Sequence, residues 1–308
     1  MALTTINAAN TQSPSPSAAG AIPVTVDNFT RAETDTYFAN IVKEAGGPGR
    51  FFHRREIEPI DKQIVIRGNR DTLYSAAVFD LDAGSVTITL PDAGKRFMSL
   101  IVIDEDQYTP AVYYRAGSHT FTKEQIGTRY LMLALRTFID PNDPEDLKKA
   151  HALQDAVKLD QQSSGTFTVP NWDPVSHKKV RDALLILAST LPDSDRGFGT
   201  KVQVDPVRRL ILSASAWGGN PDSEAKYLNV TPSKNDGKAV CKLTVPRDVP
   251  VDAFWSITVY DAEGRFQKNK YDSYSLNNLT AKKSADGSVA VQFGGCDGKI
   301  PNCLPTVP

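Results

Sequence analysis

The sequence contains no long apolar run and no concentrated positive charge. Nowhere does it approach the roughly 18 to 20 consecutive apolar residues that cross a bilayer, so we expect no membrane-spanning segment. Its 35 Lys and Arg residues are interspersed with 36 Asp and Glu residues, for a net charge of -1. Because nonspecific nucleic-acid binding depends on clustered cations that displace counterions, we do not expect nucleic acid to be a partner.

Several catalytic and cofactor motifs are also missing. The chain has no G-x-S-x-G nucleophile elbow, no G-x-x-x-x-G-K-[ST] phosphate loop and no G-x-G-x-x-G after a strand. Its four histidines form neither H-E-x-x-H nor H-x-H, spacings that help to bring two imidazoles to one metal ion. We therefore predict no cofactor and no dedicated metal site.

Residues 1–22 lack both the apolar core and the positively charged start of a secretion signal. They are rich in Ser, Thr, Asn, Ala and Pro, a composition typical of disorder, and we predict a disordered tail. As written, the sequence indicates a cytoplasmic protein. If a secretion signal has been removed from a precursor, an extracytoplasmic location is the alternative.

Cysteine is scarce, and the three cysteines differ in context. Cys296 and Cys303 flank a loop with Gly298 and Pro301, which could bring their Cα atoms within the separation of about 4.4 to 6.8 Å that a disulfide requires. Zinc would need two further Cys or His ligands nearby, and the spacing is not the C-x-x-C of redox motifs. We therefore favour a disulfide or two free thiols. Cys241 lies in an alternating pattern and is predicted to be a small core residue of a strand.

The first half of the chain shows a change of hydrophobic period. A helix is predicted over 30–45, where Thr30 and Glu33 have the spacing of a capping box. From residue 63 to 139, apolar residues alternate in short runs separated by turn residues, which is typical of an antiparallel β-sandwich. The runs predicted as strands are Ile64 and Ile66, Leu73–Phe79, Val86–Leu90, Phe97–Ile103 and Leu131–Leu135.

From residue 140 the spacing becomes helical, and after residue 219 it alternates again. Two predicted helices begin at Asp173 and Asp205, each an N-cap residue followed by Pro. The helix before them is indicated by the stripe Leu147, Ala150, Leu153 and Val157. The later runs predicted as strands are Tyr227–Val230, Ala239–Val245, Ala253–Tyr260 and Val289–Phe293.

We therefore predict a mainly β protein in which two antiparallel β-sandwich modules are separated by an inserted three-helix segment. The first module, with its leading helix, spans residues 23–139. The helical segment spans 140–219, and the second module spans 220–308.

Two sets of segments carry a resemblance to a known family. In the first half they are 65–75 (VIRGNRDTLYS), 78–84 and 87–98; in the second half they are 227–237, 254–260 (FWSITVY), 274–278 and 293–298. These segments resemble a bacterial family of paired domains of unknown function, DUF1254 followed by DUF1214. The resemblance implies an immunoglobulin-like or jelly-roll-like first sandwich and a jelly-roll second sandwich. It implies no catalytic residues.

The end of the chain departs from that family. Family members usually continue beyond the region of Cys303 into one more strand rich in Trp, Tyr and Arg, whereas this sequence ends at Pro308. The resemblance therefore implies a truncated second module with an unpaired sheet edge, which is a template for pairing with another chain.

The most prominent polar cluster lies at 67–74, between two apolar runs. Arg offers a bidentate fork for a carboxylate or phosphate, Asp can take a proton or bind a metal, and Tyr is a weak acid. We interpret the cluster either as a network that pins a loop or as a ligand or catalytic site. The candidate catalytic residues are Arg70, Asp71, Tyr74 and His53, and the candidate ligand-binding residues are Arg67, Asn69, Tyr108 and Trp217.

Two of these candidates have simple structural alternatives. Trp217 precedes two glycines and either stacks on a planar ligand or is a core aromatic beside a helix end. Tyr108 follows Asp104-Glu105-Asp106, which lacks the spacing of a calcium loop and is predicted to be a solvated turn.

We favour a small-ligand-binding or structural protein, because no complete catalytic constellation is visible in the sequence. A small molecule is therefore an expected partner. The alternative is a hydrolytic or metal-dependent enzyme with its site around Asn69-Arg70-Asp71. A homo-oligomer that hides exposed sheet edges is a further reading.

Overall fold

The computed structural model of the chain describes residues 20–63 and 67–307. Helices account for 21% and strands for 22% of these residues. The protein is therefore a mixed helix and strand protein with several antiparallel sheets, rather than the mainly β protein predicted. Most of the predicted tail, and the strand predicted at Ile64 and Ile66, lie outside the described residues.

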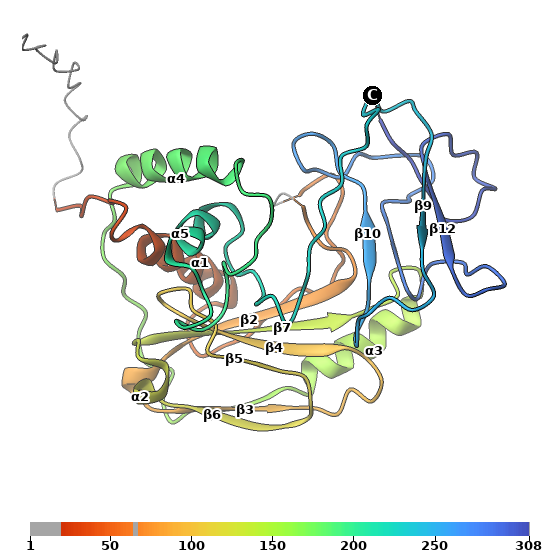
Figure 1. The fold of residues 1–308 in the computed structure, drawn as a ribbon. Coiled ribbons are helices and arrows are strands. Elements are labelled where there is room, and N and C mark those ends of the chain that lie inside the picture. The colour runs from red at the N-terminus through yellow and green to blue at the C-terminus, as the bar shows by residue number, and fades with distance from the viewer. Residues whose placement is uncertain (1–19, 64–66, 308) are drawn as a thin grey trace, which may run out of the picture.

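A five-stranded sheet lies at the centre of the first module (Figure 1). Its strand order is β1-β2-β7-β4-β5, and each strand is antiparallel to its neighbour. The three long strands lie where the alternating pattern predicted them, because one residue in two faces each side of the sheet. The bounds are β1 Phe52–His53, β2 Thr72–Asp80, β7 Tyr130–Phe138, β4 Met98–Asp104 and β5 Ala111–Tyr113.

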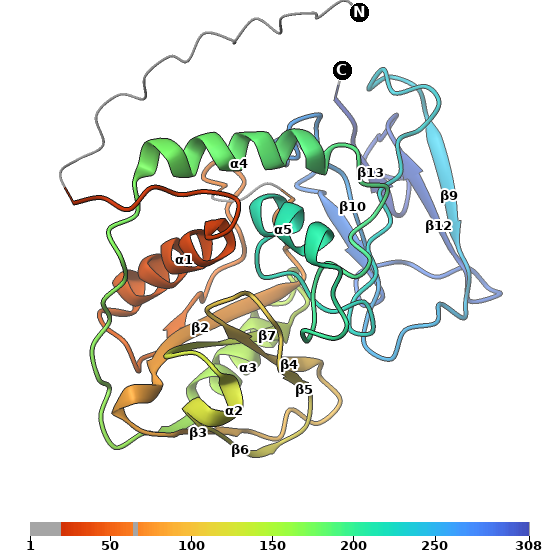
Figure 2. The same ribbon diagram turned by 60° about the vertical axis from the view of Figure 1, so that its left-hand side comes forward.

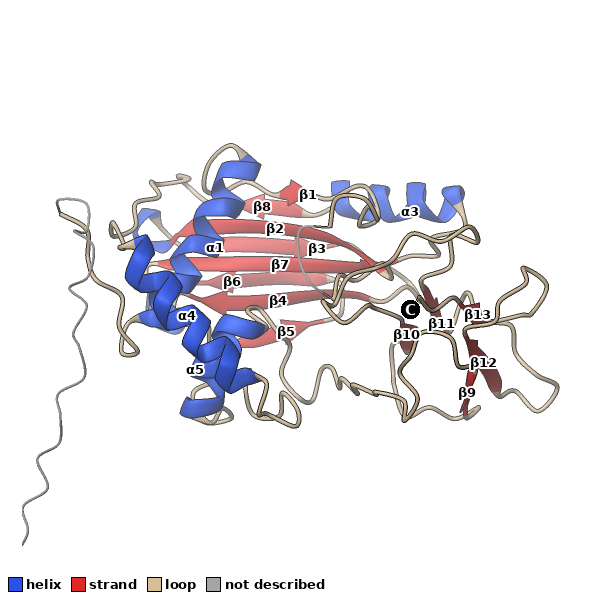
Figure 3. Ribbon diagram, turned by 90° about the horizontal axis from the view of Figure 1, so that it is seen from above, coloured by secondary structure: helices blue, strands red, loops and turns tan. Residues whose placement is uncertain are grey.

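One face of this sheet packs against a second, three-stranded sheet of order β6-β3-β8 (Figures 1 and 3). The strands are β6 Gly117–Phe121, β3 Val86–Leu90 and β8 Lys158–Asp160. The shared core includes Phe79, Ile88, Leu100, Leu131, Leu133 and Leu135, each fully buried. Strand β8 corrects the prediction that 140–219 is wholly helical: Leu159 packs on this core, while both of its neighbours are exposed.

The opposite face of the five-stranded sheet packs against α1, Phe29–Ala45. The predicted capping box is wrong, because the N-cap residue is Asn28 and it makes no side-chain cap. Thr30 and Glu33 are instead buried: the Thr30 hydroxyl lies 3.3 Å from Ser213 Oγ, and the Glu33 carboxylate pairs with two side chains of α4. These pairs are His177 Nε2 at 2.7 Å and Arg181 Nη1 at 2.8 Å.

Three helices lie within residues 140–219, as predicted, and two of them cover α1 (Figure 2). They are α3 Pro144–Asp155, α4 Pro174–Ala188 and α5 Pro206–Ser215. Both predicted caps are confirmed: the Asp173 carboxylate accepts the N–H of Ser176, and Asp205 accepts the N–H groups of Val207 and Arg208. Such caps are each worth about 1 kcal/mol because they satisfy amides that the helix leaves free.

The second module holds two small sheets, β13-β12-β9 and β10-β11. Their strands are β9 Cys241–Val245, β10 Ser256–Thr258, β11 Ser275–Asn277, β12 Val289–Phe293 and β13 Cys303–Leu304. Cys296 and Cys303 form a disulfide with a Cα separation of 5.7 Å, which is one of the two states, disulfide or free thiols, that the sequence left open. Cys241 begins β9 and is only half-buried.

The segment 227–230, predicted to be a strand, forms no regular structure. Leu228 and Val230 are both 83% exposed. With no sheet surface to cover these side chains, alternation alone does not produce a strand. Among the described residues, strand β9 pairs with β12 alone, so this side of the sheet has an open edge there.

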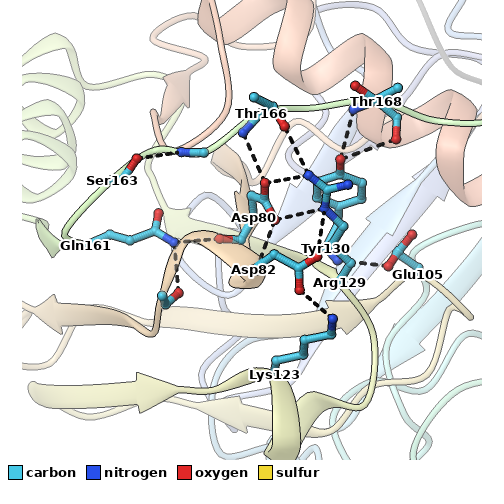
Figure 4. A network of polar contacts seen from close by, with 12 residues as sticks. Asp80, Asp82, Glu105, Lys123, Arg129, Tyr130, Gln161, Ser163, Thr166 and Thr168 are labelled. Atoms are coloured by element: carbon cyan, nitrogen blue, oxygen red, sulfur yellow. Dashed lines mark hydrogen bonds and ion pairs between the residues drawn. The ribbon is translucent and has the colours of Figure 1, made fainter.

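A polar network ties the end of β2 to the segment 161–168 (Figure 4). Arg129 donates to both carboxylate oxygens of the buried Asp80, at 3.0 and 2.8 Å, and Thr166 N donates to Asp80 as well. Gly165 approaches so closely that an added Cβ would lie 2.6 Å from Asp80 Oδ2, at a φ of +65° that favours glycine. The network fixes the path of the chain from β8 towards α4.

Candidate functional site

The predicted cluster at 67–74 lies where the five-stranded sheet meets the second module. Asp71 is 2% exposed, and its carboxylate accepts a hydrogen bond of 2.9 Å from Asn277 Nδ2 of β11. Burial raises the pKa of Asp71, while hydrogen bonds from Ser256 and Asn277 and the charge of Arg136 oppose that rise. The contact joins residues 206 positions apart, so Asp71 connects the two modules.

Asn69 and Arg70 also make structural contacts. Asn69 Oδ1 accepts the backbone N–H groups of Asp71 and Thr72 at 2.6 and 3.1 Å, which fixes the turn into β2. The Arg70 guanidinium donates to the carbonyl of Glu58 and lies 5.2 Å from the ring centre of Tyr274. Burial lowers the pKa of Arg70. These contacts favour the structural interpretation of the segment.

Arg67 has an exposed side chain, and its backbone contacts the second module. Its φ is 51°, and its N–H donates to Gly264 O at 2.7 Å. Next to it, Gly68 O accepts the hydroxyl of Tyr260 at 2.8 Å. Burial raises the pKa of Tyr260 to about 12. Tyr260 therefore keeps its proton at neutral pH and acts here as a hydrogen-bond donor.

Of the two other candidate catalytic residues, Tyr74 lies near Asp71, since both interact electrostatically with Tyr260, whereas His53 does not join them. Tyr74 is 36% exposed and lies opposite Arg136 in the β2–β7 ladder. His53 Nδ1 lies 2.8 Å from the hydroxyl of Ser75, which is buried and also accepts from Gln154 Nε2 at 3.1 Å. Because alternate strand residues face opposite sides, Ser75 and His53 lie on the other face from Tyr74.

Trp217 is a packing residue between α1 and the sheet. Its ring stacks on Tyr37 with centroids 4.2 Å apart, and its Nε1 donates to Thr34 Oγ1 at 3.1 Å. The face of the indole is therefore covered by the protein itself. The geometry favours the core reading of this residue over ligand stacking.

Tyr108 lines a surface cavity of about 310 Å³. Its walls come from the end of β4, from the end of α2 (Lys123–Ile126) and from the loop before α5. The centre of the Tyr108 ring lies 4.4 Å from Arg209 Cζ and 5.4 Å from Lys201 Nζ. The other lining residues are Asp104, Asp106, Pro110, Ile126, Gly127, Thr128, Thr200 and Lys201.

The turn that carries Tyr108 is not the solvated turn predicted from 104–106, because Asp104 and Glu105 are buried. Asp104 Oδ1 accepts the N–H groups of Asp106 and Tyr108 at 2.9 and 2.8 Å. Burial raises the pKa of Asp104 to about 6, against those hydrogen bonds. In the described part of the chain no donor reaches Asp104 Oδ2.

Sequence reasoning missed Arg136, Asn277 and the role of Asp104. A signal existed for Arg136, since it is the charged residue of the otherwise apolar run LMLALRTF. Asn277 and Asp71 carry no such signal, because their contact depends on how the modules dock.

No group of three or more His, Cys, Asp or Glu side chains among residues 20–63 and 67–307 is arranged to hold a metal ion. Within the same ranges, no helix is long and apolar enough to cross a membrane.

The comparisons with known proteins identify domains but no activity. Residues 48–161 match the family described as protein of unknown function DUF1254, and residues 227–308 match protein of unknown function DUF1214. None of the curated proteins matches the chain.

Two solved structures resemble the chain. The VPA0106 protein from Vibrio parahaemolyticus is 17% identical, with a TM-score of 0.64 over 91% of this chain and 89% of that one. An uncharacterized protein from Burkholderia cenocepacia is 14% identical, with a TM-score of 0.46 over 90% of this chain and 79% of that one. The first shares the fold of this chain. With both domain matches in the predicted order, the chain belongs to the tandem DUF1254 and DUF1214 proteins.

Proposed function

We propose that the protein binds a small molecule in the cavity beside Tyr108. The observation that carries the proposal is a buried carboxyl, Asp104, in the wall of a cavity of about 310 Å³. That volume is at the lower end of the range for small-molecule sites. No residue of the described ranges donates to Asp104 Oδ2, which can therefore accept from a ligand, and Lys201 brings a positive charge to the same cavity.

The chemistry of the lining favours a ligand rich in hydrogen-bond donors. Two carboxyls, Asp104 and Asp106, accept hydrogen bonds from hydroxyl or amine groups, and Pro110 and Ile126 provide apolar surface. Arg31 already neutralises Asp106, at 2.7 Å. Asp104 is therefore the group whose hydrogen bonding a ligand would complete.

Saturation-transfer NMR on the full chain, with a set of uncharged monosaccharides as probes, tests this proposal. The Asp104→Asn variant keeps an Oδ1 acceptor for the turn but loses the carboxylate, and we expect it to bind the best probe at least about tenfold more weakly. Lys201→Ala should weaken binding less, and Lys234→Ala, at an exposed position outside the cavity, is the control. Binding that is unchanged in Asp104→Asn, or no binding by any probe, would contradict the proposal.

We also propose the finer description of the fold as two sandwiches of immunoglobulin-like or jelly-roll type, with the second module beginning at 220 and β8 included in the first. Two face-to-face sheets support it in the first module. In the second, Ile257 and Leu276 of one small sheet share a core with Val289 and Val291 of the other. Homo-oligomers are tested directly by light scattering of the purified chain.

A further inference from the structure

Arg136 lies on the face of the five-stranded sheet that α1 covers, but beyond the end of α1. Tyr130, Met132 and Ala134 of the same strand pack in the core beneath α1. Because strand side chains alternate, Arg136 continues that row towards the second module. There it meets Phe254, which stacks on Phe138 with ring centres 4.4 Å apart.

Three aromatic rings hold the Arg136 guanidinium. Its central carbon lies 5.9 Å from the ring centres of Tyr74 and Phe97 and 5.8 Å from that of Phe254. We call these four residues the Arg136 cluster. Ring faces attract the cation and restrict its rotamers without occupying its N–H groups. The guanidinium is therefore oriented in advance while its donors remain available.

Nearly all the donor capacity of Arg136 is unused by the chain. A guanidinium has five N–H groups, and the hydrogen bond that Arg136 makes is from Nε to Thr72 Oγ1 at 3.5 Å, the long limit of such a bond. Across the described ranges, Nη1 and Nη2 have no acceptor and no carboxylate lies within ion-pair distance of Arg136. The carboxyl of Asp71 is near but is engaged by Asn277.

The cluster is also open to solvent. Arg136 is half-buried, Tyr74 is 36% exposed and Ser256, which borders Asp71, is exposed. The residues of the cluster are absent from the lining of the cavity beside Tyr108. A ligand here would occupy a separate place, where the two modules meet.

We propose that the Arg136 cluster binds the carboxylate of a small aromatic or otherwise planar acid. The guanidinium fork matches the two oxygens of a carboxylate, and the exposed edge of Tyr74 offers apolar contact to the body of the ligand. A single negative charge suits the site better than the dianion of phosphate. The reason is that two carboxylates near the cluster would repel a second negative charge. Asp71 lies near enough to interact with Arg136, and Glu224 accepts the hydroxyl of Tyr114, whose ring packs on Phe97.

Titration of the full chain with sodium benzoate, followed by ¹H–¹⁵N NMR at constant ionic strength, tests the proposal. Benzamide is the matched probe, with the same ring and no charge. We expect benzoate to shift the Arg136 Nε–H signal with saturation, and benzamide to bind at least about tenfold more weakly. Equal shifts with benzoate and benzamide would overturn the proposal. Tighter binding by inorganic phosphate than by benzoate would overturn the assigned ligand class.

Variants of Arg136 separate the contribution of the paired guanidinium hydrogen bonds from that of the positive charge. Arg136→Lys keeps the positive charge and should lose about tenfold in benzoate affinity, because a single ammonium cannot make the paired hydrogen bonds. Arg136→Gln should abolish saturable binding, and Arg247→Gln, at an exposed arginine beside Asp248, should bind as the wild type does. Wild-type affinity in Arg136→Gln would end the proposal. If Arg136→Gln does not fold, the proposal is still tested by the lysine variant and by the titrations of the wild type with benzoate and benzamide.

Discussion

The two modules differ in how their strands are stabilised. In the first, β2 and β7 are nine residues long and lie between two layers, with a fully buried core on one side and α1 on the other. In the second, no described strand exceeds five residues and the core has five buried members. The first module has enough apolar surface to hold its strands together, whereas the second also depends on a disulfide and on contacts with its neighbour.

The two modules also differ in how the pKa values of their carboxyl groups are shifted. Burial raises the pKa values of Asp35, Asp71 and Asp104 in the first module. In the second, backbone N–H groups lower the pKa values of Asp236 and Asp297, which lie in exposed turns. Acid should therefore favour these three buried carboxyls of the first module and weaken the turns of the second, although it should also weaken the Asp80–Arg129 pair, because Arg129 lowers the pKa of Asp80.

The largest effect expected is in the core shared by the two large sheets. Leu133→Ala should lower the free energy of unfolding by about 2 to 5 kcal/mol, because it leaves a cavity among fully buried side chains. Leu276→Ala, in the thinner second core, is the matched substitution and should cost less. Urea denaturation of both variants measures the difference, and equal losses would mean that the cores are equally well packed.

Removing the disulfide tests the second module. We expect the double variant Cys296→Ser with Cys303→Ser to lose about 2 to 3 kcal/mol, because the unfolded chain is no longer held in a short loop. Hydrogen exchange should rise in β12 and β13 while β2 and β7 stay protected. Uniform exchange across both modules would show that they unfold as one unit.

The pH dependence of stability should identify the buried acid of α1. Asp35 is 1% exposed and accepts Trp172 Nε1 at 2.8 Å, and burial raises its pKa to about 6. Its contribution to stability is therefore complete below the unfolded pKa and is lost as the pH rises through about 6. Relative to the wild type, Asp35→Asn should gain roughly 2 to 3 kcal/mol between pH 4 and pH 7.

Urea denaturation at the two pH values measures that gain. Asp236→Asn is the control, since its lowered pKa places any loss of stability in more acidic solution. A difference between Asp35→Asn and the wild type that does not change with pH would show that Asp35 titrates normally.

The contact between modules should have a smaller effect. Asn277→Ala removes the donor to the buried Asp71, together with the Oδ1 that accepts the N–H groups of Leu279 and Thr280, and should cost about 1 to 2 kcal/mol. It should also speed hydrogen exchange at β11 and at the start of β2. Asn278→Ala, at the next position in the chain, is the comparison. Loss of protection confined to β11 would mean that Asp71 does not hold the modules together.

Substitutions in the exposed segment 227–230 should have the least effect. Leu228 is 83% exposed, so Leu228→Ser should change the free energy of unfolding by less than about 0.5 kcal/mol. Thermal unfolding provides the measurement. A large loss would mean that this segment is covered by another surface in solution.

Prediction from the sequence succeeded where a local rule dominates. The long strands followed from alternation, α4 and α5 from an Asp-Pro start, and the proximity of Cys296 and Cys303 from a short loop with Gly and Pro. It failed where the structure of a segment depends on packing against residues that are distant in the sequence. The capping box at Thr30 is replaced by contacts with Ser213, and β8 exists because Leu159 finds a place on the core of the large sheets.

The candidate site was less predictable than the fold. The polar residues at 67–74 were recognised, yet their roles depend on partners such as Asn277 and Tyr274, which are some 200 positions away. Tyr108 was named as a ligand contact, but the burial of Asp104 beside it was not foreseen.

The order of residues determines the period of each element, the helix starts and the likeness to the two domains, because these depend on neighbours within a few positions. Whether a charged side chain is solvated, paired or left with free donors depends on which surfaces fold against it. Asp71 became a link between modules, and Nη1 and Nη2 of Arg136 have no acceptor among the described residues, through the packing of a second module whose place along the sheet no local pattern encodes.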